Sequence, residues 1–126
     1  MLSFEESEVW VAELAGQLPE EILNGLNCGI ILLPDTLIDD DGLLILGQYH
    51  VDPMGLGRYV TINYGSIVEA YGYLSNDRFR EKLRYVLYHE LTHHLESLAG
   101  DKSLEIKDAH DKRRMLGGFG RRLLRR

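Results

Sequence analysis

One long stretch of helical periodicity, from about Asp77 to Ala99, constrains the fold of this chain most strongly. Apolar side chains recur there every three or four residues, which is the spacing of a helix with one buried face. Gly100 follows directly and favours a helix end at that point. The apolar stripe consists of Leu83, Leu87, Leu91, Leu95 and Leu98. We therefore expect one long helix whose leucines face the core.

Shorter elements precede this helix. Ser3 and Glu6 have the spacing of a capping box, and Pro19 predicts the end of the helix that they begin. A second short helix is expected over 19–23 and another over 65–74. Apolar, β-branched and aromatic segments predict strands over 28–33, 43–51 and 58–64. We expect the first strand to be buried and the second to bulge at Gly47. The predicted fold class is α+β, with a small sheet packed on helices.

The chain has 126 residues, which is room for one domain. Residues 1–111 hold all 20 acidic side chains and seven basic ones, a net charge of −13, and we interpret them as that domain. Residues 112–126 hold seven basic side chains and no acidic one, so we expect a flexible basic tail. The acidic body disfavours nucleic acid as the main partner.

Three further features indicate where the protein works. No apolar run approaches the roughly 20 residues of a membrane span, so we expect no membrane association. The acidic N-terminus lacks the apolar stretch of a secretory signal. The single cysteine, Cys28, cannot form an internal disulfide. Together these features predict a cytoplasmic protein.

The long helix carries the motif His89-Glu90-Leu91-Thr92-His93, an HExxH pattern. Histidines four residues apart lie on one face of a helix, where both rings can reach one zinc ion. At about 100° per residue, His89 lies about 200° around the helix from Leu87 and from Leu91. We therefore expect the histidine face to point away from the leucine stripe, toward a cleft.

Glu90 is the expected catalytic residue. Its position beside His89 lets it reach a water molecule at the metal, take the proton of that water as a general base, and pass it to a leaving amine. Zinc suits this ligand set because imidazole nitrogens and a carboxylate are donors that it prefers.

The third protein ligand has to come from outside the motif. A helix that runs to Gly100 ends about 10 Å beyond His93, and the chain needs three or more extended residues to return. This geometry favours Glu105, with Asp101 as the next choice if the helix ends earlier. Asp108 and Glu96 are the remaining candidates.

Several other side chains have smaller expected roles. We interpret Glu96 as a residue that orients a ligand histidine, and His94 as a residue beside the ligands or at the surface. His50 and His110 are expected at the surface. Tyr49 is the first candidate to stabilise an oxyanion.

These residues resemble a family of small bacterial zincin-like metallopeptidases, the minimal zincins. The likeness covers roughly residues 4–110 and rests on three stretches: the opening helix with Leu18-Pro19, the segment Leu46-Gly-Gln-Tyr49, and the doubled histidine in His89-Glu-Leu-Thr-His-His94. The resemblance implies a few strands over an active-site helix, one zinc ion held by His89 and His93, and Glu90 as the base.

The chain departs from this family at one place. The family pattern HExxHxxGxxD, or the same with a final Glu, would need glycine and an acid where Glu96 and Ala99 stand. The third ligand therefore does not carry over from the family, and Glu105 depends on the geometry of the returning chain.

From these observations we expect a cytoplasmic, zinc-dependent metallopeptidase that acts on peptides or proteins. The strand over 59–64 is expected to pair with an extended substrate. One alternative is an inactive binding module that keeps the zincin fold. A second is a metal-dependent nuclease, which only the basic tail favours.

Overall fold

The computed structural model describes residues 1–27, 29–52, 54 and 57–100, and its first element is the capped helix α1 (Phe4–Gly16). The Ser3 hydroxyl accepts a hydrogen bond from the Glu6 amide at 3.1 Å, and the Glu6 carboxylate accepts one from the Ser3 amide at 2.9 Å. The predicted capping box is thus confirmed. Helix α2 (Glu20–Leu23) begins directly after Pro19.

Three short strands form one mixed sheet: β1 (Ile30–Leu33), β2 (Gly47–Val51) and β3 (Arg58–Asn63). Their order is β1-β3-β2. Strand β1 runs parallel to β3, and β2 runs antiparallel to it. The α+β fold class is therefore confirmed.

The order of the strands corrects the expectation that the strand over 59–64 pairs with a substrate. Strand β3 hydrogen-bonds to β1 on one side and to β2 on the other, so both of its edges are already used. An extended peptide needs an open sheet edge. In the described sheet, β1 and β2 are the edge strands.

Two details of the outer strands also differ from expectation. Strand β1 is half-buried rather than buried, and Ile31 is 39% exposed, because this strand lies at the edge of the described sheet. Strand β2 contains no bulge at Gly47, since Gly47 to Val51 pair one-to-one with Ile62 to Arg58. Gly47 has a different role, described below.

Helix α3 (Tyr64–Tyr71) follows β3 without a gap, and helix α4 (Asn76–Ala99) comes next. The Ser75 hydroxyl caps α4 by accepting a hydrogen bond from the Arg78 amide at 3.4 Å. Gly100 is the C-cap, as the sequence predicts, and has an extended backbone. The longest predicted element is therefore confirmed to within one residue at its start.

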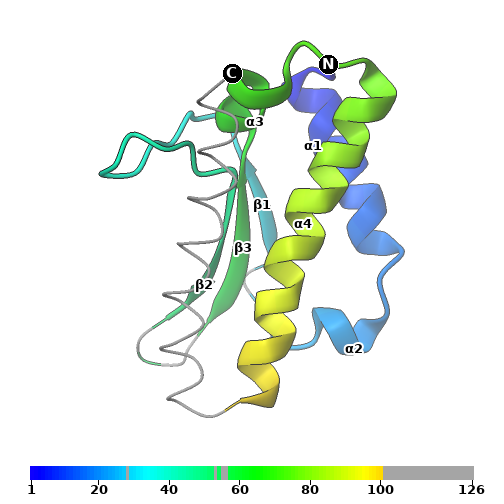
Figure 1. Ribbon diagram of the computed structural model, residues 1–126. Coiled ribbons are helices and arrows are strands. Elements are labelled where there is room, and N and C mark those ends of the chain that lie inside the picture. Colours follow the sequence, from blue (N-terminus) through cyan, green and yellow to red (C-terminus); the bar gives the residue numbers. More distant parts are fainter. Residues whose placement is uncertain (28, 53, 55–56, 101–126) are drawn as a thin grey trace.

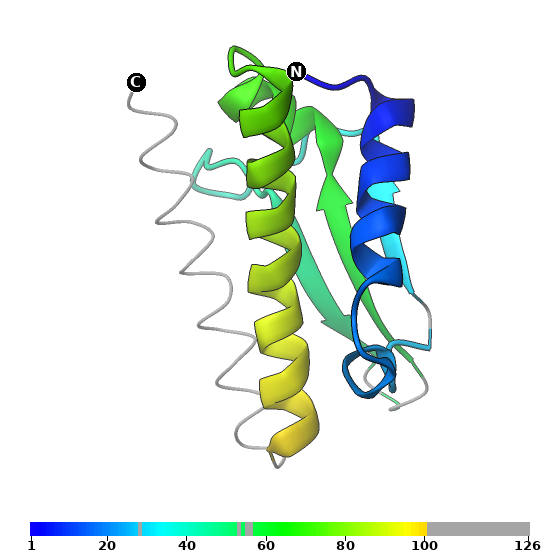
Figure 2. The ribbon, with the colours of Figure 1, turned by 90° about the vertical axis from the view of Figure 1, so that its right-hand side faces the viewer.

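Helices α1 and α4 lie side by side on one face of the sheet (Figure 1). The view from the helix side shows α4 over β2 and β3, with α1 over β1 (Figure 2). Helix α3 packs at one end of this arrangement (Figure 1). The core fills the space between helices and sheet, and its fully buried members include Leu14, Leu46, Val60, Ile62, Phe79, Leu83 and Leu87. This layering places one long face of α4 directly against β2 and β3.

The expected leucine stripe of α4 is only partly buried. Leu83, Leu87 and Leu91 are in the core, whereas Leu95 and Leu98 are each 43% exposed. A helix has 3.6 residues per turn, so each fourth residue lies about 40° further around the helix axis than the one before it. A stripe made of every fourth residue therefore turns away from the sheet. Polar side chains occupy the buried face in its place.

Among the described residues, no helix combines the length and the apolar character that crossing a bilayer requires. All described elements fall within residues 1–100, inside the domain predicted over 1–111. The predicted tail over 112–126 lies outside the described residues.

Candidate metal centre

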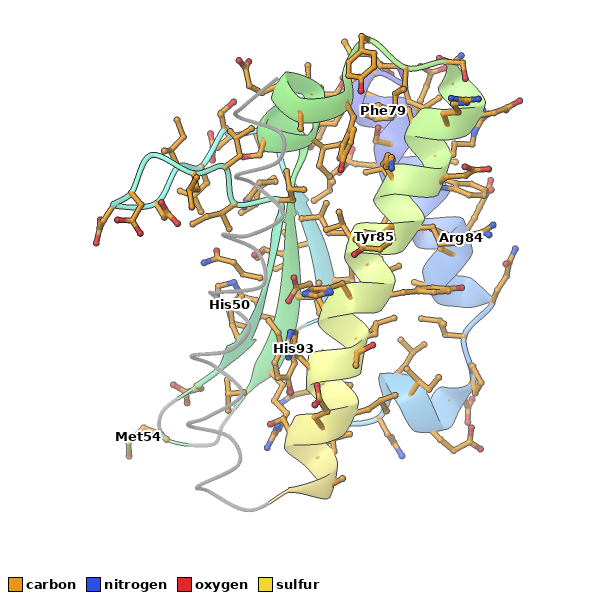
Figure 3. The ribbon with its side chains drawn as sticks, in the orientation of Figure 1. His50, Met54, Phe79, Arg84, Tyr85 and His93 are labelled. Atoms are coloured by element: carbon orange, nitrogen blue, oxygen red, sulfur yellow. The ribbon has the colours of Figure 1, made fainter. Side chains whose placement is uncertain are left out.

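The HExxH motif lies in the second half of α4. The rings of His89 and His93 stand on consecutive turns, with centroids 5.1 Å apart and planes at 79° to each other. His93 is buried and faces the sheet (Figure 3), and His89 is half-buried. The Nε2 atoms of both rings are buried. The structure thus brings together the two imidazoles that the sequence predicts as ligands.

The orientation of the motif differs from expectation. Glu90 is fully buried on the same side of α4 as Leu83 and Leu87, and His93 is also buried there. The drift of the leucine stripe explains the difference, because the buried face of α4 is centred near Leu83 and Glu90 rather than between Leu87 and Leu91. The motif therefore lies between α4 and the sheet, with His89 toward the margin of this face.

Gly47 at the start of β2 makes room for Glu90. A Cβ atom at position 47 would lie 3.3 Å from the Cγ atom of Glu90 and only 2.7 Å from a methyl group of Val86. It would also lie 3.2 Å from the carbonyl oxygen of Thr61. Only glycine allows α4 and β2 to approach this closely.

Glu96 lies beside the second histidine. One of its carboxylate oxygens is 3.5 Å from Nδ1 of His93, and its side chain is half exposed. A carboxylate at the Nδ1 side of an imidazole directs the other nitrogen, Nε2, toward a metal. This placement suits the orienting role that the sequence predicts for Glu96.

His94 is fully buried and belongs to a hydrogen-bond network. Its Nδ1 lies 2.8 Å from the Tyr49 hydroxyl, and its Nε2 lies 3.1 Å from the carbonyl oxygen of Asn24. Arg58 donates from one nitrogen, Nη1, to the Tyr49 hydroxyl at 2.9 Å and to the Ser97 hydroxyl. Both ring nitrogens of His94 are therefore used within the protein.

The protonation of His94 follows from this environment. Burial lowers the pKa of His94, and the nearby Arg58 guanidinium lowers it further, while hydrogen bonds from the ring to backbone carbonyls of Asn24 and Ile22 oppose the shift. Burial and the neighbouring guanidinium thus both disfavour the charged imidazolium.

Tyr49, the predicted oxyanion stabiliser, is buried in the same network. Its hydroxyl is bonded to His94 and Arg58, so the structure supports a role in holding the fold together here. His50, expected at the surface, is half-buried instead. It stacks on Tyr59 with ring centroids 4.4 Å apart, and its Nε2 is 2.8 Å from the Thr61 hydroxyl. Because strand residues alternate, His50 faces away from α4, as Figure 3 shows.

The predicted third ligands, Glu105, Asp101 and Asp108, lie outside the described residues, as does His110. Within the described part of the chain, no group of three or more His, Cys, Asp or Glu side chains is arranged to hold a metal ion. The described donor set is thus two imidazoles, which fits zinc in chemical type, and a third donor has to come from elsewhere.

Sequence reasoning missed Gly47 as a packing residue, and it missed Arg58, Ser97 and Asn24 altogether. Arg58 carried a usable signal, because it is the one lysine or arginine among the first 77 residues. A lone cation in an acidic segment is a candidate for a specific structural role. Ser97 and Asn24 carry no comparable signal, since their partners are distant in sequence.

Comparison with known proteins shows a similarity to a solved structure. No protein-family model and no curated protein matches the chain. A solved structure, that of a conserved hypothetical protein from Thermus thermophilus, is 30% identical to it, with a TM-score of 0.65. The match covers 78% of this chain and 98% of that protein. The similarity therefore extends over nearly the whole of the thermophile protein.

Proposed function

The chain belongs to the same protein family as the conserved hypothetical protein from Thermus thermophilus, and from its own candidate metal centre we propose that it is a zinc-dependent metallopeptidase. The name of that relative states no activity, so the proposal depends on the residues of this chain. The proposed fold is zincin-like, because a small mixed sheet carries the HExxH helix on one face. The proposed substrate is a peptide or protein in the cytoplasm.

One observation carries this proposal. His89 and His93 stand on consecutive turns with ring centroids 5.1 Å apart, and Glu90 lies next to His89 in the chain. Both Nε2 atoms and both carboxylate oxygens of Glu90 are buried. Two imidazoles and one carboxylate, withdrawn together from bulk water, are the groups that peptide hydrolysis at a metal requires.

Each residue has a distinct role in the proposed reaction. Zinc, when bound by His89 and His93, supplies Lewis acidity toward the scissile carbonyl and lowers the pKa of a water molecule. Glu90 accepts the proton of the attacking water and delivers it to the leaving amine. Glu96 holds the Nδ1 side of His93 and so keeps its Nε2 directed toward the metal.

The third ligand in this proposal is Glu105, with Asp101 as the next choice. A catalytic zinc site takes three protein ligands and keeps one position open. Helix α4 ends at Ala99, so the returning chain has to supply the remaining donor from beyond Gly100. Both candidates meet that condition in the sequence.

Metal content per chain tests the proposal most directly. We expect about one zinc ion per chain in untagged wild-type protein, measured by elemental analysis. His93→Ala and Glu105→Ala should each lose it. A peptide-library digest then tests activity, with Glu90→Ala as the inactive control.

Different outcomes separate the alternatives. A protein that takes up no zinc would overturn the proposal and reduce HExxH to part of a helix face. A protein that holds zinc but cleaves no peptide would be the binding module that keeps the zincin fold. Cleavage of RNA that is lost in His93→Ala would identify a metal-dependent nuclease.

A further inference from the structure

A continuous series of hydrogen bonds runs beside the proposed metal ligands. The Asn24 carbonyl can only accept, so Nε2 of His94 donates to it. Nδ1 of the same ring lies 2.8 Å from the Tyr49 hydroxyl. The Arg58 guanidinium can only donate, so the Tyr49 oxygen accepts from Arg58. Arg58, Tyr49, His94 and the Asn24 carbonyl are therefore joined in one continuous series of hydrogen bonds.

These hydrogen bonds connect four elements that are far apart in sequence. Arg58 begins β3, Tyr49 lies in β2, His94 and Ser97 belong to α4, and Asn24 follows α2. His94 and Ser97 are three positions apart in α4, so the sheet contacts the helix over nearly one full turn. Such a contact resists both rotation of α4 about its axis and sliding along it.

A second contact holds α4 at the start of the motif. Val86 and Glu90 pack against Gly47 so closely that a Cβ atom there would not fit. His89 and His93 thus lie within a stretch of α4 that β2 contacts at both ends: Gly47 contacts residues 86 and 90, and Tyr49 contacts residue 94. A shift of the helix at either place would move both ligand rings.

We propose that Tyr49, His94 and Arg58 are positioning residues for the metal centre, because their buried hydrogen bonds set the placement of α4, and with it His89 and His93, against β2. The inference rests on the proposed function only in taking these two histidines as ligands. It gives each member of the doubled histidine its own role, since His93 binds the metal and His94 anchors the turn that carries it.

Removal of the Tyr49 hydroxyl tests this role. Tyr49→Phe keeps the buried ring but removes one donor and one acceptor, so the hydrogen bonds to His94 and Arg58 are lost together. Tyr64→Phe is the matched control. This variant also removes one hydroxyl, which donates to the Leu2 carbonyl at 2.6 Å. Tyr64 is remote in sequence from the motif, and Leu2 lies just before α1.

The experiment measures zinc affinity by competition with a chromophoric chelator, and the visible spectrum of the Co²⁺-loaded protein. We expect Tyr49→Phe to bind zinc about 10- to 100-fold more weakly than wild type and to change the Co²⁺ spectrum. Tyr64→Phe should bind zinc within about twofold of wild type. Ser97→Ala removes the hydrogen bond from Arg58 to the Ser97 hydroxyl and leaves the bond to Tyr49. It should therefore weaken zinc binding less than Tyr49→Phe does.

The outcomes distinguish this inference from the proposed function. Wild-type protein that binds no zinc would refute both. Zinc binding by wild type, with Tyr49→Phe and Tyr64→Phe equally unaffected, would refute the positioning role and leave the metal site standing. If Tyr49→Phe does not fold, Ser97→Ala decides: unchanged zinc affinity and an unchanged Co²⁺ spectrum in that variant would overturn the inference.

Discussion

The side chain of Glu90 lies directly against Gly47: its Cγ atom is 3.3 Å from the point that a Cβ atom at position 47 would occupy. The proposed general base therefore lies beside the space that a side chain at position 47 would fill. This closeness depends on a residue without a side chain, and it links the chemistry of α4 to the geometry of the sheet.

Gly47→Ala should disturb the core and Glu90 together. The added methyl group would overlap a methyl of Val86, whose β-branched side chain has little rotamer freedom in a helix. We expect a loss of about 1–3 kcal/mol in the free energy of unfolding, measured by urea denaturation. Gly16→Ala is the control, because its added Cβ meets no described atom within 4 Å apart from its chain neighbours and the nearby backbone of its own helix. Equal stability of the two variants would contradict the close approach.

Glu90→Gln should separate metal binding from catalysis. The amide has the shape of the carboxylate but cannot accept the proton of water. We expect zinc content to stay near one per chain, while peptide hydrolysis falls by a factor of about 100 or more. Hydrolysis at the wild-type rate would exclude Glu90 as the base.

Glu96→Gln should weaken zinc binding by about 10-fold, because the carboxylate 3.5 Å from Nδ1 of His93 no longer supports the ring with its charge. Glu81→Gln is a suitable comparison, since it removes the same charge from an exposed position of α4, two turns before the motif. Isothermal titration with Zn²⁺ measures both variants. If both lose affinity equally, general electrostatics and not contact with His93 is responsible.

Tyr64 should make the protein less stable at alkaline pH. Burial raises the pKa of its phenol above the ordinary value of 10.0, and the negative charges of Glu5 and Glu6 add to the shift. Because the unfolded chain then loses the proton first, this contribution to stability is complete below pH 10.0 and is lost as the pH rises through the folded-state pKa.

Urea midpoints measured on both sides of that pH test this prediction. Tyr64→Phe should be less stable by about 1 kcal/mol at neutral pH, because the hydrogen bond to the Leu2 carbonyl is gone. Its stability should then fall less steeply than that of wild type on the alkaline side. Parallel curves for the two proteins would show that Tyr64 does not titrate differently in the folded state.

Removal of residues 112–126 should leave peptide hydrolysis nearly unchanged. This segment holds seven of the 14 basic side chains, so its loss raises the net negative charge from −6 to −13. RNA binding that depends on the tail would weaken sharply and lose its salt dependence. A large loss of peptidase activity would instead assign the tail a role in that reaction.

Local signals accounted for most of the secondary structure. The Ser3–Glu6 capping box, Pro19 and Gly100 each act within a few residues, so the bounds of α1, α2 and α4 follow closely from them. The HExxH spacing likewise brings two imidazoles to one side of a helix, because four residues make about one turn.

Contacts between distant segments were harder to predict. The central position of β3 depends on which strands pair, and the pattern of a single strand does not encode its neighbours. The exposure of Leu95 depends on which way α4 is turned against the sheet. The hydrogen bonds that link Arg58 to Tyr49, Tyr49 to His94 and His94 to Asn24 span 9, 45 and 70 positions, and these residues share no local pattern.

Local sequence was thus sufficient to predict the helix that carries His89, Glu90 and His93, because helical periodicity and capping depend on residues close together in the chain. Which way that helix is turned, the contact of Gly47 with Glu90, and the bond from Tyr49 to His94 emerged only from the packed protein. The rotation of a helix is set by the surface on which it packs, and here that surface is built from strands remote in sequence.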